Sequence, residues 1–555
     1  MKGKLQFKFV LLSFLFIQII PDTSYSQFKV WANYFAVSDS VLCKGNVSMN
    51  NYAAVTGKVK NTSTGWDVYT LIYGIWSGQQ QNLWIYSTEN DEEPVDIVAD
   101  VINMDVYILC KSTDSTGKNN ILILKYSQAG GFRWAKSFDS LNENDIPVSI
   151  DFKFNSNNKN FLYLTSYSYT IPKQGYDILT QKIDTAGNFI WSSYYNDSLF
   201  TISHDIPVKI ISTDNSNFAY IAGTSTDSSD YSQTVLLKYD SSGNLLWKQN
   251  FGTGVPRNNF AKAMDFKNNK IALGGVIDMG NHFNYLTLLY NTDGNLQWSQ
   301  IYNGPGDGDD NLSDIVFDQT DNVYVTGSSY VDSLRKNDYC TVKYLQSGDT
   351  AWVNFYNGAA SGNDSAVAMI TDNFNCVFVT GKSEEMNGYY AYGSVLYNTS
   401  GWSHWTRKFQ LPQIPGDNIP VEVSKHSFTN SFLISGTTTG DSLNSFSSIY
   451  YAGVIDGIDD NNSLNAGSYK LNQNYPNPFN PRTKINYELH VTSGDLVTLK
   501  VFNVLGNEVA TLVNEKQNSG RYSVEFDGSN FSRGVYFYKL SANGISTTMK
   551  MLLVK

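Results

Sequence analysis

The chain has few of the residues that usually carry metal binding and nucleophilic catalysis. It contains five histidines and four cysteines among 555 residues. The histidines lie far apart, without the spacing of a metal site, at His204, His282, His404, His426 and His490. No H-E-x-x-H, G-x-S-x-G or P-loop pattern occurs. These absences argue against zinc chemistry and against histidine-based catalysis.

Charged residues are also scarce, at 16% of the chain. Asp and Glu outnumber Lys and Arg by 51 to 40, which gives a formal net charge of -11. Because the basic residues are scattered, there is no basic stripe to neutralise a phosphate backbone, and we expect no nucleic-acid partner. The aromatic content of 14% and the 42 glycines instead indicate a large β-rich core in more than one domain.

The apolar run at the N-terminus, Phe9 to Ile20, is too short to span a membrane. It has about 12 residues, and a spanning helix needs roughly 20. Three lysines precede it, and the small residues Ser24 and Ser26 follow it. This pattern predicts a secretory signal peptide, residues 1–26, cleaved between Ser26 and Gln27. No later segment is long and apolar enough to span, so we expect a soluble mature chain without a transmembrane segment.

The four cysteines lack metal-ligand spacing. Disulfides are permitted in an exported chain, but we interpret the cysteines as small buried thiols within strands. They are Cys43, Cys110, Cys340 and Cys376.

Eight of the eleven tryptophans recur at steps of 50 to 57 residues. They are Trp31, Trp84, Trp134, Trp191, Trp247, Trp298, Trp352 and Trp405. Six have a glycine four residues earlier, and seven have Phe or Tyr four residues later. The glycines predict a hairpin turn before each tryptophan strand, since such turns need positive φ.

Each unit of about 53 residues also contains three earlier strand-like runs. A lysine stands nine residues before four of the tryptophans, at Lys125, Lys182, Lys238 and Lys343. Runs such as NVYVTG and CVFVTG end in a small residue, which predicts close packing of one sheet on the next. A shorter segment introduced by Asp or Asn comes first.

Four-stranded units repeating at this period predict an all-β fold, a β-propeller over residues 28–456. Residues 28–35 are the first tryptophan strand and would complete the last unit, which lacks its own fourth strand. That arrangement gives an eight-bladed β-propeller. A seven-bladed ring is the alternative if the first unit, with Gln80 at the turn glycine position, is not a full blade. A linear solenoid is a further alternative.

The strings DNVYVTGSS and NDYCTVKYLQSGDTAWVNFYNG resemble the SBBP-type β-propeller repeat. In that family a VYVTG strand, a lysine-bearing strand and a Gly-then-Trp strand follow one another. The resemblance implies a bacterial extracytoplasmic propeller, and it implies no particular reaction.

A second domain follows a polar linker, residues 457–468. Residues 469–555 open with three prolines and then alternate as short strands, which predicts a small immunoglobulin-like β-sandwich. We expect strands at 495–504, 508–513, 520–526 and 534–541.

This segment resembles the type A C-terminal sorting domain of the type IX secretion system. NYPNPFNP, VFNVLGNEVATLV, GVYFYKL and MKMLLVK follow one another in the family's order. The resemblance implies export through the periplasm to the cell surface or medium, with the outer-membrane secretion machinery as partner. It implies a sorting motif of Asn474, Tyr475, Pro476, Asn477, Pro478, Phe479, Asn480, Pro481, Gly506, Gly534 and Tyr536.

The densest acidic cluster, Asp307, Asp309 and Asp310, is a candidate calcium site. A solvated turn is the plainer interpretation, since the cluster lacks EF-hand spacing; we expect no other cofactor or metal and name no catalytic residue. The introducing Asp residues could line a central channel, although a turn or cap role explains them better. Tyr389, Tyr390 and Tyr392 could form an aromatic platform, with strand packing as the alternative.

Two hypotheses about function follow from these patterns. The first is a non-enzymatic propeller that acts as a binding or scaffold module for an extracellular protein or glycan ligand. The second is an extracellular glycoside-type hydrolase whose carboxylates come from several blades, because two carboxyl groups suffice for that reaction.

Overall fold

The chain divides into two compact units, Met1–Ile455 and Asp456–Lys555. The computed structural model describes residues 29–37, 40–127, 131–139, 144–154, 160–170, 175–196, 204–213, 218–226, 231–252, 257–410, 416–426, 431–440, 444–451, 468–471, 474, 479–490, 495–503, 507–518, 520–542 and 545–554. These residues contain strands and turns and no helix, so none of them forms a helix that could cross a membrane.

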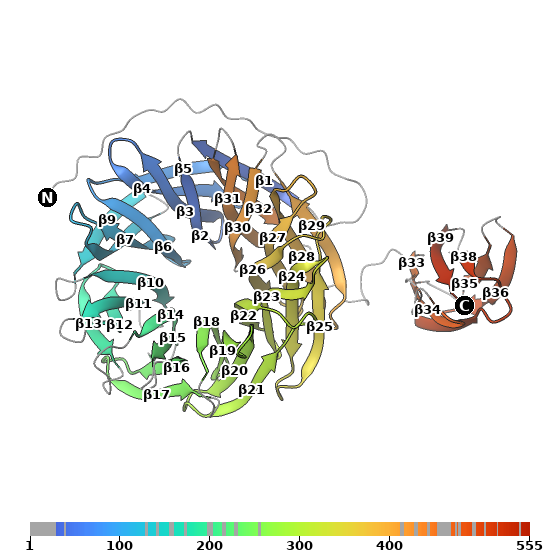
Figure 1. Ribbon diagram of the computed structural model, residues 1–555. Coiled ribbons are helices and arrows are strands. Elements are labelled where there is room, and N and C mark those ends of the chain that lie inside the picture. The colour runs from blue at the N-terminus through green and yellow to red at the C-terminus, as the bar shows by residue number, and fades with distance from the viewer. Residues whose placement is uncertain are drawn as a thin grey trace. The chain divides into compact units, whose positions relative to one another are not determined.

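The first unit is a ring of four-stranded antiparallel sheets, eight of them among the described residues (Figure 1). The innermost strands are β2 (Val41–Ser48), β6 (Asp91–Asp100), β10 (Asp145–Lys153), β14 (Ile206–Ser212), β18 (Asn259–Lys267), β22 (Asp310–Phe317), β26 (Asp364–Thr371) and β30 (Gly416–Lys425). The second strands are β3 (Tyr52–Asn61), β7 (Asp105–Thr113), β11 (Phe161–Thr170), β15 (Ala219–Thr226), β19 (Lys270–Asp278), β23 (Val323–Asp332), β27 (Val377–Glu384) and β31 (Phe432–Gly440).

The third strands are β4 (Gly65–Gly74), β8 (Asn119–Ser127), β12 (Gly175–Asp184), β16 (Ser232–Tyr239), β20 (Phe283–Asn291), β24 (Lys336–Tyr344), β28 (Tyr390–Tyr397) and β32 (Asn444–Tyr451). The outermost strands are β5 (Gln80–Tyr86), β9 (Gly131–Phe138), β13 (Phe189–Tyr195), β17 (Leu245–Phe251), β21 (Leu296–Tyr302), β25 (Thr350–Tyr356), β29 (Ser403–Phe409) and β1 (Lys29–Val37). Each of the eight recurring tryptophans lies in an outermost strand.

The ring closes through the N-terminal strand, as predicted. β1 pairs antiparallel with β32, with Phe35 opposite Phe446, and so completes the sheet of β30, β31 and β32. The innermost strands contact one another in succession around the ring, including β30 with β2. The first unit of the repeat forms a full sheet, β2 to β5. Gly78, with φ of 66°, supplies its turn in place of Gln80, which favours eight blades over seven.

The hydrophobic core of the ring lies between neighbouring sheets. Trp84, Ile108 and Tyr126, for example, belong to one buried cluster that joins the β2–β5 sheet to the β6–β9 sheet. The small residue that ends the NVYVTG run allows this close approach. A Cβ at Gly327 would meet the Asn311 carbonyl of its own sheet and lie 2.8 Å from the Tyr285 hydroxyl of the preceding sheet. The predicted close packing of one sheet on the next is therefore seen at Gly327, whereas at Gly275 and Gly381 the nearest atoms belong to the glycine's own sheet.

Side chains of the outer strands form hydrogen bonds with the turn of the next sheet. The indole N–H of Trp352 donates to the carbonyl of Thr399 at 3.1 Å, and the Asn354 side chain donates to the Gly401 carbonyl at 2.6 Å. Gly401 has φ of 86° and lies against the Trp352 ring, so that a Cβ there would lie 2.9 Å from ring carbons. The tryptophan of one repeat thus packs on the turn glycine of the following repeat.

The second unit is a small β-sandwich, as predicted. One sheet contains β33 (Ser468–Leu471), β34 (Arg482–His490) and β37 (Gly520–Asp527), and the other contains β36 (Glu508–Gln517), β35 (Asp495–Phe502), β38 (Gly534–Ala542) and β39 (Ile545–Leu553). Its core includes Tyr487, Leu499 and Tyr538, all essentially without exposed surface. The sequence analysis did not identify β39 as a strand.

We expect Gly401→Ala to destabilise the propeller by about 2–4 kcal/mol, because positive φ costs about 1–2 kcal/mol for alanine and crowding of Trp352 adds a similar amount. Gly388→Ala is the matched control. Gly388 also has positive φ, 82°, but its Cβ would meet nothing within 4 Å, so only the backbone cost applies. Denaturant unfolding of both variants measures the difference. Equal losses would contradict the role given to the Trp–Gly contact.

Candidate functional site: the channel-lining strands

The innermost strands carry a β-bulge at the same position in all eight sheets. The register shifts fall, for example, between Pro94 and Asp96, between Leu312 and Asp314, and between Pro420 and Glu422. A bulge re-aims the side chain that follows it. The residues after the bulge are Gly45, Asp96, Ser149, Lys209, Ala263, Asp314, Ala368 and Glu422. Four of these eight positions therefore have an ionisable side chain.

The carboxylates on these strands bridge to the next sheet. The second carboxylate oxygens of Asp96 and Asp314 accept the backbone N–H groups of Ile150 at 3.0 Å and Met369 at 2.8 Å, respectively. One oxygen of Glu422 accepts the N–H of Asn46 at 2.9 Å.

Two further carboxylates lie two residues beyond the bulge and make the same kind of bridge. Asp151 accepts from the Ser212 N–H at 2.7 Å, and Asp265 accepts from the Phe317 N–H at 2.8 Å. Five inner-strand carboxylates thus hold the neighbouring inner strand by its backbone.

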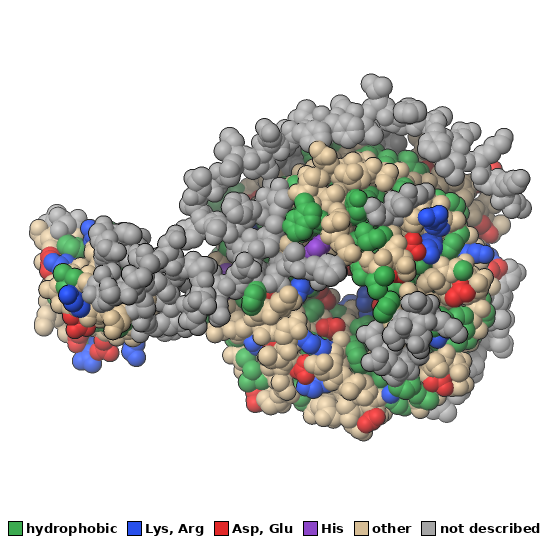
Figure 2. Space-filling model, turned by 180° about the vertical axis from the view of Figure 1, so that it is seen from behind, with side chains coloured by type: hydrophobic (Ala, Val, Ile, Leu, Met, Phe, Trp, Pro, Cys, Tyr) green, Lys and Arg blue, Asp and Glu red, His purple; other side chains and the backbone are tan. Residues whose placement is uncertain are grey.

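Lys209 on β14 faces this group of carboxylates. Its ammonium nitrogen lies 3.9 Å from an oxygen of Asp96. Asp96 raises the pKa of Lys209 above its usual range, and the pKa also responds to Glu422, Asp151 and Asp314. These partners come from four other sheets, so the side chains converge on a common central space. Figure 2 shows an opening through the face of the ring, with acidic and basic side chains around its margin.

Two of the inner carboxyl groups are hard to ionise. Burial raises the pKa of Asp314 to about 7, and the neighbouring Asp265 contributes in the same direction. Burial and the charge of Asp96 raise the pKa of Glu422 to about 8. The pKa values of Asp151 and Asp265 are also raised, mainly by burial. The channel therefore contains carboxyl groups that exchange protons near neutral pH.

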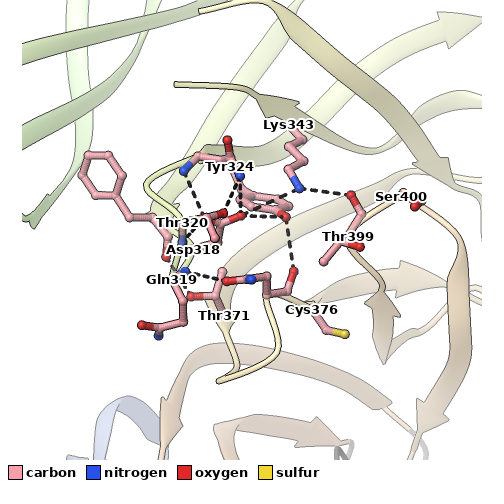
Figure 3. Close-up of polar contacts among 12 residues, drawn as sticks. Asp318, Gln319, Thr320, Tyr324, Lys343, Thr371, Cys376, Thr399 and Ser400 are labelled. Carbon is pink, nitrogen blue, oxygen red and sulfur yellow. Dashed lines mark hydrogen bonds and ion pairs between the residues drawn. The ribbon is translucent and has the colours of Figure 1, made fainter. Parts of the chain in front are cut away.

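The buried lysine of the repeat belongs to the framework and lies outside this group. Lys343 donates to the Thr399 carbonyl of the next sheet at 3.0 Å, with a carboxylate oxygen of Asp318 at 3.8 Å and the Tyr324 ring at 5.0 Å (Figure 3). Burial lowers the pKa of Lys343. Lys125, Lys182 and Lys238 donate in the same way to Thr185, Ser241 and Thr292.

The candidate calcium residues do not converge on one point. Asp307 accepts from the Asn303 side chain at 2.8 Å, and Asp309 accepts from the Phe283 N–H at 2.9 Å. Asp310 is buried and accepts the N–H of Gly304 at 2.7 Å. Within the described ranges, no group of three or more His, Cys, Asp or Glu side chains is arranged to hold a metal ion.

The Asp residues that introduce the first strand-like segment of each repeat fall into two classes, which the sequence alone did not separate. Asp96 and Asp314 follow the bulge and face the channel, whereas Asp145 and Asp205 begin the inner strand or immediately precede it and are buried. Asp145 accepts from the hydroxyl of Ser168, its partner across the β10–β11 pair, which is a contact between strands and not the predicted turn or cap role.

The tyrosine and cysteine candidates are mostly buried framework residues. Tyr392 is buried and donates to the Ser447 carbonyl at 3.4 Å, which is strand packing rather than a platform. All four cysteines are free and buried, as expected; Cys376 directly precedes a strand, and the other three lie within strands.

The sequence analysis missed Lys209, Glu422, Asp151 and Asp265. A usable signal was present for Lys209 and Glu422, because the dipeptide Pro-Val marks the bulge. The same dipeptide precedes Asp96, Ser149, Lys209 and Glu422.

Of the sorting motif, Asn474, Phe479, Asn480, Pro481, Gly534 and Tyr536 are described. Tyr475, Pro476, Asn477, Pro478 and Gly506 lie outside the described residues, as do Ser26 and Gln27 at the predicted cleavage site.

Two family comparisons match parts of the chain. Residues 473–555 match the secretion system C-terminal sorting domain, and residues 297–335 match the β-propeller repeat called SBBP. The sorting-domain match assigns the chain to type IX secretion, with the secretion machinery as partner and the cell surface or exterior as destination. The search of curated proteins gave no match.

Solved propellers resemble the chain distantly. The WD40 domain of SCAP from fission yeast shares 10% identity at a TM-score of 0.43, covering 76% of this chain and 98% of that one. The β-propeller domain of the Trilobed protease from Pyrococcus furiosus shares 8% at 0.40, covering 67% and 97%. The propeller assignment rests on the sheets described above.

We expect the propeller to lose stability as pH rises from about 5 to about 8. Glu422 has an ordinary pKa of 4.5 and a raised one of about 8 in the folded chain, so the folded state holds more protons than the unfolded state in this window. Glu422→Gln should flatten the slope, as melting temperatures across the window will measure. Asp332→Asn is the control, since the pKa of Asp332 is lowered by the Arg335 and Leu334 N–H groups and adds no slope there. An unchanged slope in Glu422→Gln would contradict this account.

Proposed function

We propose that this chain is a non-enzymatic binding or scaffold propeller, delivered by its sorting domain to the cell surface or medium, where it takes a protein or glycan ligand. The observation that carries the proposal is the engagement of the inner carboxylates. Five of them accept backbone N–H groups from the next sheet.

This engagement favours cohesion over catalysis. In Asp96, Asp265 and Asp314 the other oxygen accepts the N–H of the following residue, so both oxygens of each carboxylate already have donors. A general base must instead be oriented toward the substrate proton that it removes, whereas these carboxylates are oriented toward backbone N–H groups. Removing such an acceptor would leave a buried N–H unsatisfied, which costs about 1–3 kcal/mol. The carboxylates are therefore better explained as hydrogen-bond acceptors that hold neighbouring blades together.

Export supports the same proposal. A protein that leaves the cell needs a fold that holds its shape without cytoplasmic help, and a closed ring has few exposed sheet edges. The loops at either end of such a ring are free to vary and to contact a ligand.

We expect a chain truncated after Asp456 to stay in the periplasm, while the full chain reaches the surface or medium. The measurement is fractionation of a host that has this secretion route, with tryptophan fluorescence of the retained propeller as the folding control. Equal export of both chains would show that the C-terminal unit is an ordinary module.

The second candidate function is a glycoside-type hydrolase, favoured by one observation. Glu422, with a pKa of about 8, can be protonated near neutral pH while the charge of Asp96 acts on it, and an acid near a carboxylate is what glycoside cleavage needs. Asp314, with a pKa of about 7, is a second carboxyl group that can be protonated in this range.

We expect no release of reducing ends when the purified full chain is incubated with a panel of extracellular polysaccharides. Asp314→Asn and Glu422→Gln serve as controls, because each keeps an oxygen that can accept the bridging N–H. Turnover that both variants abolish without a loss of melting temperature would establish the hydrolase and end the binding proposal.

A further inference from the structure

The described part of the sorting motif is attached to the C-terminal strand. Phe479 makes a parallel bridge with Leu553 at the end of β39. Its N–H donates to the Leu552 carbonyl at 2.9 Å, and its carbonyl accepts the N–H of Val554 at 3.0 Å. The other edge of β39 pairs with β38 along its whole length. The last strand is therefore held on both edges at its C-terminal end.

The side chains at this bridge are closely packed. Phe479 and Leu553 are each 1% exposed, and the Phe479 ring lies 5.8 Å from that of Phe526. Gly528 donates its N–H to the Pro481 carbonyl at 2.7 Å. A Cβ at Gly528 would lie 3.0 Å from Leu553 and 3.1 Å from Phe479, so the absence of a side chain there permits the contact.

Asn474 fixes the other end of the motif to the same sandwich. Its backbone N–H donates to the Tyr538 hydroxyl oxygen at 2.9 Å, and its side-chain amide donates to the Thr483 hydroxyl at 2.9 Å. Tyr538 lies on β38, the strand that pairs with β39. Both described anchors of the motif therefore connect to the sheet that contains the C-terminal strand.

The docked register decides which side chains face outward. Met551 and Leu553 are buried, whereas Leu552 is 37% exposed and Val554 is 42% exposed. Because side chains alternate along a strand, a slip of one residue would exchange the two sets.

We propose that the secretion machinery reads β39 in this docked register rather than the terminal residues as a linear string, and that Phe479 and Asn474 are positioning residues for it. This inference rests on the proposed export role of the C-terminal unit. It explains why the motif and the terminal strand, more than 60 residues apart in sequence, belong to one signal.

The test removes one hydrogen bond between Phe479 and the end of β39 without changing a core side chain. Val554→Pro deletes the N–H that donates to Phe479, and Val554→Ala is the matched control because it also loses the valine side chain but keeps that N–H. We expect hydrogen exchange of the Met551 to Leu553 amides in the full chain to rise about threefold to tenfold in Val554→Pro relative to Val554→Ala. We expect export, measured by fractionation, to fall with it.

Two further variants separate positioning from general stability. Val513→Ala truncates a core residue on β36, at the far edge of the sheet, and should lower the melting temperature while leaving β39 exchange and export unchanged. Phe479→Ala should open β39 and reduce export, and Phe479→Leu should restore part of both.

The outcomes distinguish the two levels of the proposal. If deletion of residues 457–555 leaves export intact, the sorting role itself fails. If that deletion blocks export but Val554→Pro, with faster β39 exchange, is exported like Val554→Ala, the sorting role stands and the positioning inference is wrong. Export that follows melting temperature across all variants, Val513→Ala included, also overturns the inference.

Discussion

Each sheet of the propeller depends on backbone groups supplied by, or offered to, the sheet beside it. At the centre, Asp96 and its counterparts accept N–H groups of the next innermost strand, and at the rim Trp352 and Lys343 donate to the turn carbonyl of the next sheet. Buried polar groups must find partners, so these two sets of bonds constrain where neighbouring sheets can lie. The apolar clusters between the sheets then fill the space that those bonds define.

The same arrangement accounts for the chemistry of the channel. Bringing carboxylates from several sheets to one axis places like charges near one another in partly dehydrated surroundings, which raises the pKa of Asp314 and Glu422. Lys209 offsets part of that charge. The perturbed pKa values are thus explained by blade cohesion, because structural networks perturb titration as active sites do.

Local patterns predicted the framework well. The tryptophan spacing and the preceding glycines were sufficient for the outer strands, because a hairpin turn and a period-two strand are properties of short segments. The convergence of Lys209 with carboxylates from four other sheets could not be predicted from the sequence, because these residues come together only when the ring closes. The strand β39 was missed because its sequence, ISTTMKMLL, has a weak alternation, and its place is decided by pairing with β38 and Phe479. Gly78 was missed because it lies two residues from the position that the other repeats use.

The pairing of β1 with β32 has a consequence for the order of folding. The two strands meet residue against residue, Phe35 with Phe446, although more than 400 positions of chain separate them. A chain that emerges from a translocation pore N-terminus first presents β1 early and β32 near the end of the propeller. Seven sheets can form in sequence from local contacts, but the eighth must wait for a contact of very long range, which forms slowly. Closure of the ring is therefore the last step in the folding of this unit.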